Sequence, residues 1–182
     1  MINVKTYSLS RFEDMDSAYW GMGYRGDEIY FGLCTHDSKK SAALFHFNPS
    51  NKEIKKIFSL SEIIKDKPGF LPQGKIHTPI FTGNKGELYF GTHFAYPYGK
   101  PQNIKYKGGH IVCFNPEKNN AVDLGIPVIE EGILTMVMDK SRMILYGLSC
   151  PSFILFSYKI SDNKSKVIGR IAKKGSICRS LV

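Results

Sequence analysis

The segment GKIHTPIFTGNKGELYFGTH (residues 74–93), with GGHIVCFNPEKNNAVDLG (residues 108–125) after it, decides the fold. Both stretches contain short runs rich in Ile, Val, Tyr and Phe, which are the residues that favour strands. GNKG at residues 83–86 predicts a tight hairpin turn. Asn115-Pro116 predicts another turn, because proline cannot donate a hydrogen bond within a central ladder. Together these signals predict four antiparallel strands in one unit.

The same pattern occurs three times along the chain, over about residues 17–58, 76–125 and 132–171. In each repeat the second strand ends on an aromatic residue followed by glycine, at Phe31-Gly32, Phe90-Gly91 and Tyr146-Gly147. The three glycines are 59 and 56 residues apart. Four-stranded antiparallel units at a regular period are typical of the blades of a β-propeller.

We therefore predict an all-β fold, a single partial β-propeller domain over residues 1–182 with about three four-stranded blades. A short helix is expected only at residues 60–65, before Pro68. Residues 175–179 resemble residues 74–78, the start of a first strand, and predict the beginning of a fourth blade. Propellers have about four to eight blades, so the sequence predicts an incomplete ring. We expect a piece of a longer protein, or else two copies that close a ring.

The composition is that of an ordinary globular protein, with 42% hydrophobic and 23% charged residues among 182. No apolar run is long enough for a membrane span, and no signal peptide is visible at the N-terminus. The four cysteines are far apart and form no CxxC pair, which argues against a disulfide framework. These features predict a cytoplasmic protein with no membrane partner, or a secreted one if an N-terminal segment is missing.

The formal net charge of +9 favours an anionic partner such as an acidic glycan, a nucleic acid or a phospholipid surface. The alternative is that the lysines only aid solubility, since many of them fall in predicted turns. The lysines are scattered over turns at both ends of the predicted blades, which makes nucleic acid a less favoured partner.

Blade topology predicts that His77 and His93 lie close together. In a blade, the entry to the first strand and the end of the second strand lie at the same end. With Asn84 and Lys85 as a two-residue hairpin loop, His77 is expected opposite Thr92. The two imidazoles would then be near neighbours, and histidine is the side chain best suited to proton transfer near neutral pH.

Two further histidines, His36 and His110, map to the same end of the predicted blades. Arg179 falls one place after the His77 position in the partial fourth blade. His46 lies in the middle of a strand and is expected to be structural. The alternative interpretation carries equal weight: each of the histidines at this end could be a loop residue that only forms hydrogen bonds.

The insertion at residues 94–109 alternates aromatic and basic residues, with Tyr96, Tyr98 and Tyr106 among Lys100, Lys105 and Lys107. Aromatic faces beside cationic groups suit stacking on sugar rings that carry carboxylates or sulfates. They would equally suit the stacked bases of a single-stranded nucleic acid. A third reading is a loop that simply covers this end of the fold.

The pattern GKIHTPI at residues 74–80, GELYFGTH at residues 86–93 and GGHIVCFNP at residues 108–116 resembles the blades of β-propeller polysaccharide lyases of the ulvan-lyase type. That resemblance implies the breakage of uronate-containing chains by β-elimination. It implies that His77 is the general base and that His93 is the general acid or its partner. It also requires a nearby cation, and we expect Arg179 or residues outside the three repeats to supply it.

The resemblance implies an acidic polysaccharide or oligosaccharide as the partner, with Tyr96, Tyr98, Lys100, Tyr106, His110 and Arg179 as candidate substrate-binding residues. The cofactor is left open, because the same histidines could instead bind a divalent metal ion. The competing hypothesis is a propeller without enzymatic activity that binds a glycan or a protein. Self-association through the open blade edges is a further expectation.

Overall fold

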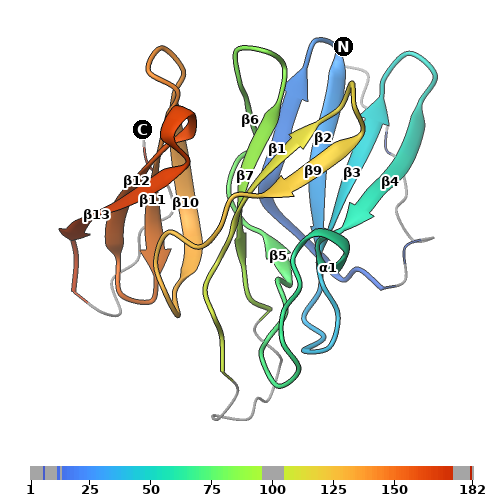
Figure 1. The fold of residues 1–182 in the computed structure, drawn as a ribbon. Helices are drawn as coiled ribbons and strands as arrows, with labels where there is room; N and C mark the ends of the chain where they lie inside the picture. Colours follow the sequence, from blue (N-terminus) through green and yellow to red (C-terminus); the bar gives the residue numbers. More distant parts are fainter. Residues whose placement is uncertain (1–5, 7–11, 13, 96–104, 174–180, 182) are drawn as a thin grey trace.

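The computed structural model describes residues 6, 12, 14–95, 105–173 and 181, and it shows three antiparallel sheets with almost no helix (Figure 1). The first sheet contains β1 (Ser17–Arg25), β2 (Glu28–Cys34), β3 (Ala43–Asn48) and β4 (Glu53–Ser59). The second contains β5 (Lys75–Ile76), β6 (Phe81–Thr82), β7 (Leu88–His93), β8 (Ile111–Asn115) and β9 (Asn120–Asp123). The third contains β10 (Gly132–Asp139), β11 (Ile144–Cys150), β12 (Ile154–Lys159) and β13 (Lys164–Arg170). The predicted all-β class and the antiparallel sheets are confirmed.

The second sheet lies between the other two, and its strand β7 shows why the sequence there is so apolar (Figure 1). Alternation along β7 directs Leu88 and Phe90 into the core shared with the first sheet. Tyr89, on the opposite face, belongs to the core shared with the third sheet. All six residues of β7 are buried, as expected for a strand that is covered on both faces.

The first strand of the second repeat is interrupted, which the sequence analysis did not predict. Of this first strand only the two ends, β5 and β6, are paired in full with β7. Between them the His77 N–H still donates to the Gly91 carbonyl at 3.3 Å, and residues 78–80 leave the ladder. Pro79 has no N–H to donate, and the Thr78 hydroxyl accepts the hydrogen bond of the Gly91 N–H at 2.8 Å. The side chain of Thr78 thus replaces a missing backbone acceptor.

The predicted hairpin register was wrong by one residue. The Gly83 N–H donates to the Glu87 carbonyl, so the loop between β6 and β7 has three residues rather than two. Gly86 closes this loop with a φ of 82°, a conformation in which glycine avoids the strain of a side chain. Continued along the strand, this register would place Thr78 opposite Thr92. The break between β5 and β6 shifts the pairing by two residues in the other direction, so that Ile76, and not His77, lies opposite Thr92.

The three glycines that mark the repeats are not equivalent. A Cβ on Gly32 would meet Ile76 of the second sheet, and one on Gly91 would meet Ile133 of the third. A Cβ on Gly147 would instead meet Phe156 of its own sheet, on the face directed back toward the second sheet. The marker glycine of the third repeat therefore lies on the face toward the preceding sheet, whereas the marker glycines of the first two repeats lie on the face toward the following sheet.

The predicted helix exists, but it is shorter than expected. It is α1 (Leu60–Ile63), and the Ser59 N–H at its start donates to the Glu62 carboxylate at 2.8 Å. Leu60 anchors it in the core between the first two sheets. A 3₁₀ turn, η1 (Ile160–Asp162), joins β12 to β13 and was not predicted.

The face of β1 that points away from the second sheet is apolar and exposed. Trp20 is 61% exposed, and Met22 and Tyr24 are comparably open. No helix in the described part of the chain has the length and hydrophobicity needed to span a bilayer. None of the three cysteines in that part, Cys34, Cys113 and Cys150, forms a disulfide.

We expect Gly32→Ala to lower the free energy of unfolding by about 1–3 kcal/mol, the usual cost of overpacking a core. The new Cβ would lie 2.5 Å from the Cβ of Ile76, a contact that requires the two sheets to move apart. Chemical denaturation measures the change. Ser165→Ala in the exposed strand β13 is the control and should change stability by less than about 0.5 kcal/mol. A Gly32→Ala protein as stable as the parent would contradict the close contact.

Candidate functional site

His77 and His93 lie together at one end of the second sheet, with their ring centroids 5.3 Å apart. The β5–β7 ladder pairs Lys75 with His93, and alternation along the chain puts His77 on the same face as Lys75. This face points toward the third sheet, where the Gly132 backbone leaves room for the His93 ring. The neighbouring imidazoles that the sequence predicted are therefore present, although the register behind the prediction differed.

Hydrogen bonds define the neutral form of both histidines. The Nδ1 of His77 lies 2.8 Å from the Leu134 carbonyl oxygen, and the Nδ1 of His93 lies 3.0 Å from the Phe94 carbonyl oxygen. A carbonyl can only accept, so each Nδ1 carries the proton and each neutral ring has its lone pair on Nε2.

Burial keeps this pair uncharged. Desolvation lowers the pKa of His77, and the positive charge of Lys75 also lowers it. The hydrogen bond to the Leu134 carbonyl raises this pKa, but by less than burial lowers it. For His93, which is only 7% exposed, burial and the neighbouring His77 lower the pKa to about 3. Both imidazoles are therefore proton acceptors rather than donors near neutral pH.

Lys75 and Tyr19 complete this group, and the sequence analysis missed both. The Lys75 side chain is 7% exposed, its Nζ donates to the Tyr19 hydroxyl at 3.1 Å, and it lies 4.4 Å from the centroid of the Tyr19 ring. The Tyr19 ring in turn stacks on His77 with 5.0 Å between centroids. The sequence could have indicated Lys75, because residues two apart in a strand lie on the same face and Lys75 precedes His77 by two residues. Tyr19 gives no such signal, because it comes from another sheet.

His36 joins the same group from the first sheet, at the end where the sequence placed it. Its Nε2 lies 3.3 Å from the Tyr19 hydroxyl, and its Nδ1 lies 2.8 Å from the Asp16 carboxylate. Burial would raise the pKa of Asp16, but hydrogen bonds from the backbone and ring of His36 lower it. We call Asp16, Tyr19, His36, Lys75, His77 and His93 the rim cluster.

The structure separates His110 from the rim cluster. The β7–β8 register places His110 opposite Thr92. Because Thr92 and His93 point to opposite faces of the sheet, the His110 side chain lies on the face away from His93. Its Nδ1 bonds to the Asp123 carboxylate at 2.8 Å, and that bond lowers the pKa of Asp123 against the effect of burial. His110 is buried, as expected for a structural histidine, and it is poorly placed to touch a substrate bound at the pair.

Tyr106 is also buried rather than presented at the surface. Its hydroxyl donates to Gln73 at 2.7 Å, and desolvation raises its pKa well above the ordinary value. Gln73 in turn accepts a hydrogen bond from Thr92 at 2.7 Å, so the phenol belongs to an internal polar network. The expected role of Tyr106 in stacking on a sugar does not fit this position.

The remaining predicted substrate-binding residues, Tyr96, Tyr98, Lys100 and Arg179, lie outside the described residues. His46 is separate from the rim cluster. It contacts Glu28 at 3.3 Å and packs on Tyr30, in agreement with its expected structural role. Across the described ranges, no three His, Cys, Asp or Glu side chains are grouped so that they could hold a metal ion.

No protein-family model matches this chain, and no curated protein matches its sequence. Solved structures do match its fold. The extracellular domain of a one-component system from B. thetaiotaomicron has a TM-score of 0.54 at 17% identity, over 83% of this chain and 16% of that one. A puromycin-hydrolyzing peptidase from Mycobacterium tuberculosis has a TM-score of 0.50 at 11% identity, over 86% of this chain and 21% of that one.

At these identities the likeness shows the fold alone. The chain spans 16% to 21% of the length of these two solved chains, so the matched region is a small part of each. The resemblance to polysaccharide lyases stays a prediction, since neither neighbour bears on it.

We expect the free energy of unfolding to fall as the pH decreases from about 6.5 toward 3. Unfolded His93 has the ordinary pKa of 6.5, whereas the folded pKa is about 3. Between these values the unfolded chain binds a proton that the folded chain excludes, and the loss should reach a few kcal/mol.

The measurement is denaturant unfolding over this pH range with His93→Asn for comparison. The asparagine amide can still donate to the Phe94 carbonyl but cannot titrate. The variant should therefore show a shallower dependence of stability on pH. Equal slopes for the variant and the parent would show that His93 is not held neutral by the fold.

Proposed function

We propose that the three sheets are consecutive blades of a β-propeller. Each sheet is antiparallel and covers the next, and the first strand of each repeat lies beside a neighbouring sheet: β1 contacts β5 and β6, and β10 contacts β7. Such an arrangement brings loops from all three sheets to one end, which is where propellers commonly bind their ligands. The rim cluster draws its residues from two sheets at that end.

We propose that the rim cluster acts on a uronate-containing acidic glycan by β-elimination. The observation that supports this most is a buried ammonium, Lys75, on the same face as two imidazoles that burial keeps neutral. A cation is needed to bind the sugar carboxylate and to stabilise the charge that develops when the adjacent carbon loses its proton. Lys75 meets that need within the described chain, whereas the sequence analysis looked for an arginine elsewhere.

Each step of the elimination can be assigned to a side chain. His77 removes the proton from the carbon next to the carboxylate through its Nε2 lone pair. The electron pair of that C–H bond forms a carbon–carbon double bond, and the bond to the glycosidic oxygen breaks. The leaving oxygen takes the proton of the Tyr19 hydroxyl. The imidazolium of His77 then gives its proton to the Tyr19 phenolate through solvent, which restores both groups. Asp16 holds the His36 ring so that its Nε2 accepts from the Tyr19 hydroxyl before the reaction.

His93 has a different role from the general acid that the resemblance implied. With a pKa of about 3, His93 is neutral at neutral pH, and its one ring proton is on Nδ1, where it is bonded to the Phe94 carbonyl. His93 instead helps His77 to take up a proton, because a neutral neighbour does not repel the imidazolium that His77 becomes.

The second candidate function is a binding module that does no chemistry. The burial of Lys75 and His93 favours it, because a group that is 7% exposed has little access to a substrate carbon. In this case Tyr19 and Lys75 would recognise an acidic sugar through stacking and charge.

The test is to offer uronate-containing polysaccharides and to record the ultraviolet absorbance of unsaturated uronate products. His77→Asn should lower the rate by about a hundredfold or more, the usual contribution of a general base. His46→Asn, which changes a histidine outside the rim cluster, should keep the activity, and melting temperatures check that both variants fold. Full activity in His77→Asn would overturn the assignment.

Two further readouts separate the alternatives. Activity should survive exhaustive chelation if the imidazole is the base, and should disappear if a bound metal ion does the chemistry. Binding of acidic glycans without any product would support the binding module.

A further inference from the structure

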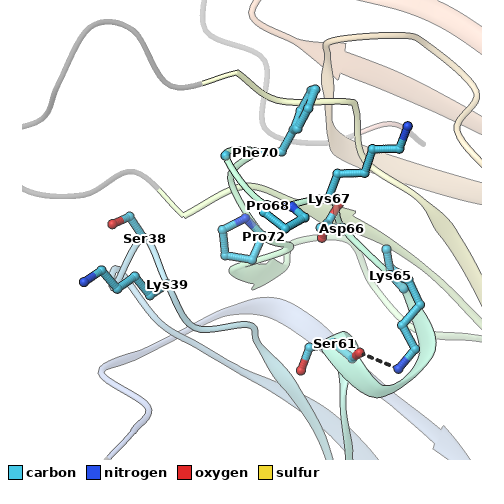
Figure 2. A pocket seen from close by; sticks show the side chains of 11 residues that line it. Ser38, Lys39, Ser61, Lys65, Asp66, Lys67, Pro68, Phe70 and Pro72 are labelled. Carbon is cyan, nitrogen blue, oxygen red and sulfur yellow. Dashed lines mark hydrogen bonds between the residues drawn. The ribbon is translucent and has the colours of Figure 1, made fainter.

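A pocket of about 570 Å³ opens among the loops at one end of the first two sheets, within the range of small-ligand sites. Figure 2 shows it between the turn at Ser38 and Lys39 on one side and the loop of residues 65–72 on the other, with Ser61 of α1 nearby. None of the proposed chemistry of the rim cluster uses this pocket.

The pocket is joined to the rim cluster through two chain segments. Ser38 follows His36 by two residues in the loop after β2, and Pro72 precedes Lys75 by three residues at the entry to β5. A ligand bound at the rim cluster that extends along this end of the sheets would therefore pass over the 38–39 turn and the 65–72 loop.

The charges around the pocket favour an anion. Its lining contains Lys39, Lys65 and Lys67 against one carboxylate, Asp66. The carboxylate of Asp66 lies 3.5 Å from the Gln73 amide, and burial raises its pKa.

Nearby acidic groups are already occupied by backbone N–H groups. The Asp37 carboxylate accepts from the Lys39 backbone at 2.8 Å, and the Glu62 carboxylate accepts from Ser59 at 2.8 Å. Lys107 adds another cation beside the pocket, with its Nζ 5.7 Å from the centroid of the Phe70 ring.

The shape and the apolar lining favour a sugar rather than a lone inorganic ion. Phe70, Pro68, Pro72 and Ile64 provide apolar surface, while the hydroxyls of Ser38 and Ser61 can bond to sugar hydroxyls. The volume exceeds what a single sulfate or phosphate needs. An amphipathic ring that carries a negative group matches all of these features.

We propose that this pocket is a second subsite that binds a sulfated or carboxylated sugar of the same acidic glycan. This inference rests on the proposed function, because it takes the glycan to be bound first at the rim cluster. The side chains of Lys39 and Lys67 lie on opposite sides of the pocket (Figure 2), and they would select the substrate. The chemistry would be carried out by the rim cluster alone.

The experiment compares a sulfated uronate tetrasaccharide with its desulfated counterpart by calorimetric titration. The parent protein should prefer the sulfated form, with an affinity that falls as salt is added. The double variant Lys39→Gln/Lys67→Gln should lose about tenfold in affinity for the sulfated form, as expected for two exposed ion pairs, and little for the desulfated one. Lys118→Gln/Lys164→Gln is the control, because both lysines are exposed at the opposite end, Lys118 in the turn before β9 and Lys164 at the first position of β13.

The outcomes distinguish this inference from the proposed function. Sulfate-dependent binding that the pocket variant loses, without any cleavage, supports the subsite and contradicts the lyase. Cleavage with no preference for the sulfated form, or an equal loss of affinity in the control variant, overturns the subsite and leaves the lyase intact. No binding of either tetrasaccharide overturns both.

Discussion

The contact between Ile76 and two glycines of the first sheet is the constraint on which the arrangement of the site depends. Ile76 is fully buried, and its Cβ and Cγ2 occupy the space that a side chain on Gly21 or Gly32 would need. Because side chains alternate along a strand, fixing Ile76 against the first sheet forces Lys75 and His77 to the other face. The packing of the two sheets thereby selects which polar residues lie beside each other at this end.

That constraint also explains how much of the site could be predicted. The proximity of His77 and His93 follows from strand order and alternation, and so it survived a hairpin register that was wrong by one residue. The three-residue loop closed by Gly86 and the break at Pro79 changed the pairing together, and each is a local backbone effect that the repeat pattern does not show. The strands could be predicted because each carries its own apolar run.

The rest of the site could not be predicted, for two physical reasons. Tyr19 meets Lys75 and His77 only through the packing of different sheets, and no periodicity within one chain segment reports such a contact. His110 lies at the predicted end of the sheet. Because successive side chains in a strand point to opposite faces, its register places it on the face away from His93, where it bonds to Asp123. The topology predicts at which end of the sheets a residue lies, whereas the direction of its side chain depends on the register.

Burial gives the rim cluster its chemical character. A lysine ammonium beside two imidazoles would repel their protons even in water, and the low dielectric of the interior strengthens that repulsion. The same surroundings make Tyr19 the natural partner of Lys75, since the phenol supplies both an acceptor oxygen and an aromatic face. A sugar carboxylate that reached Lys75 would have to compete with the Tyr19 oxygen, which accepts a hydrogen bond from the ammonium. In the proposed mechanism the same ammonium would therefore meet both the sugar carboxylate and the phenolate that Tyr19 becomes, so that one buried cation would serve recognition and chemistry together.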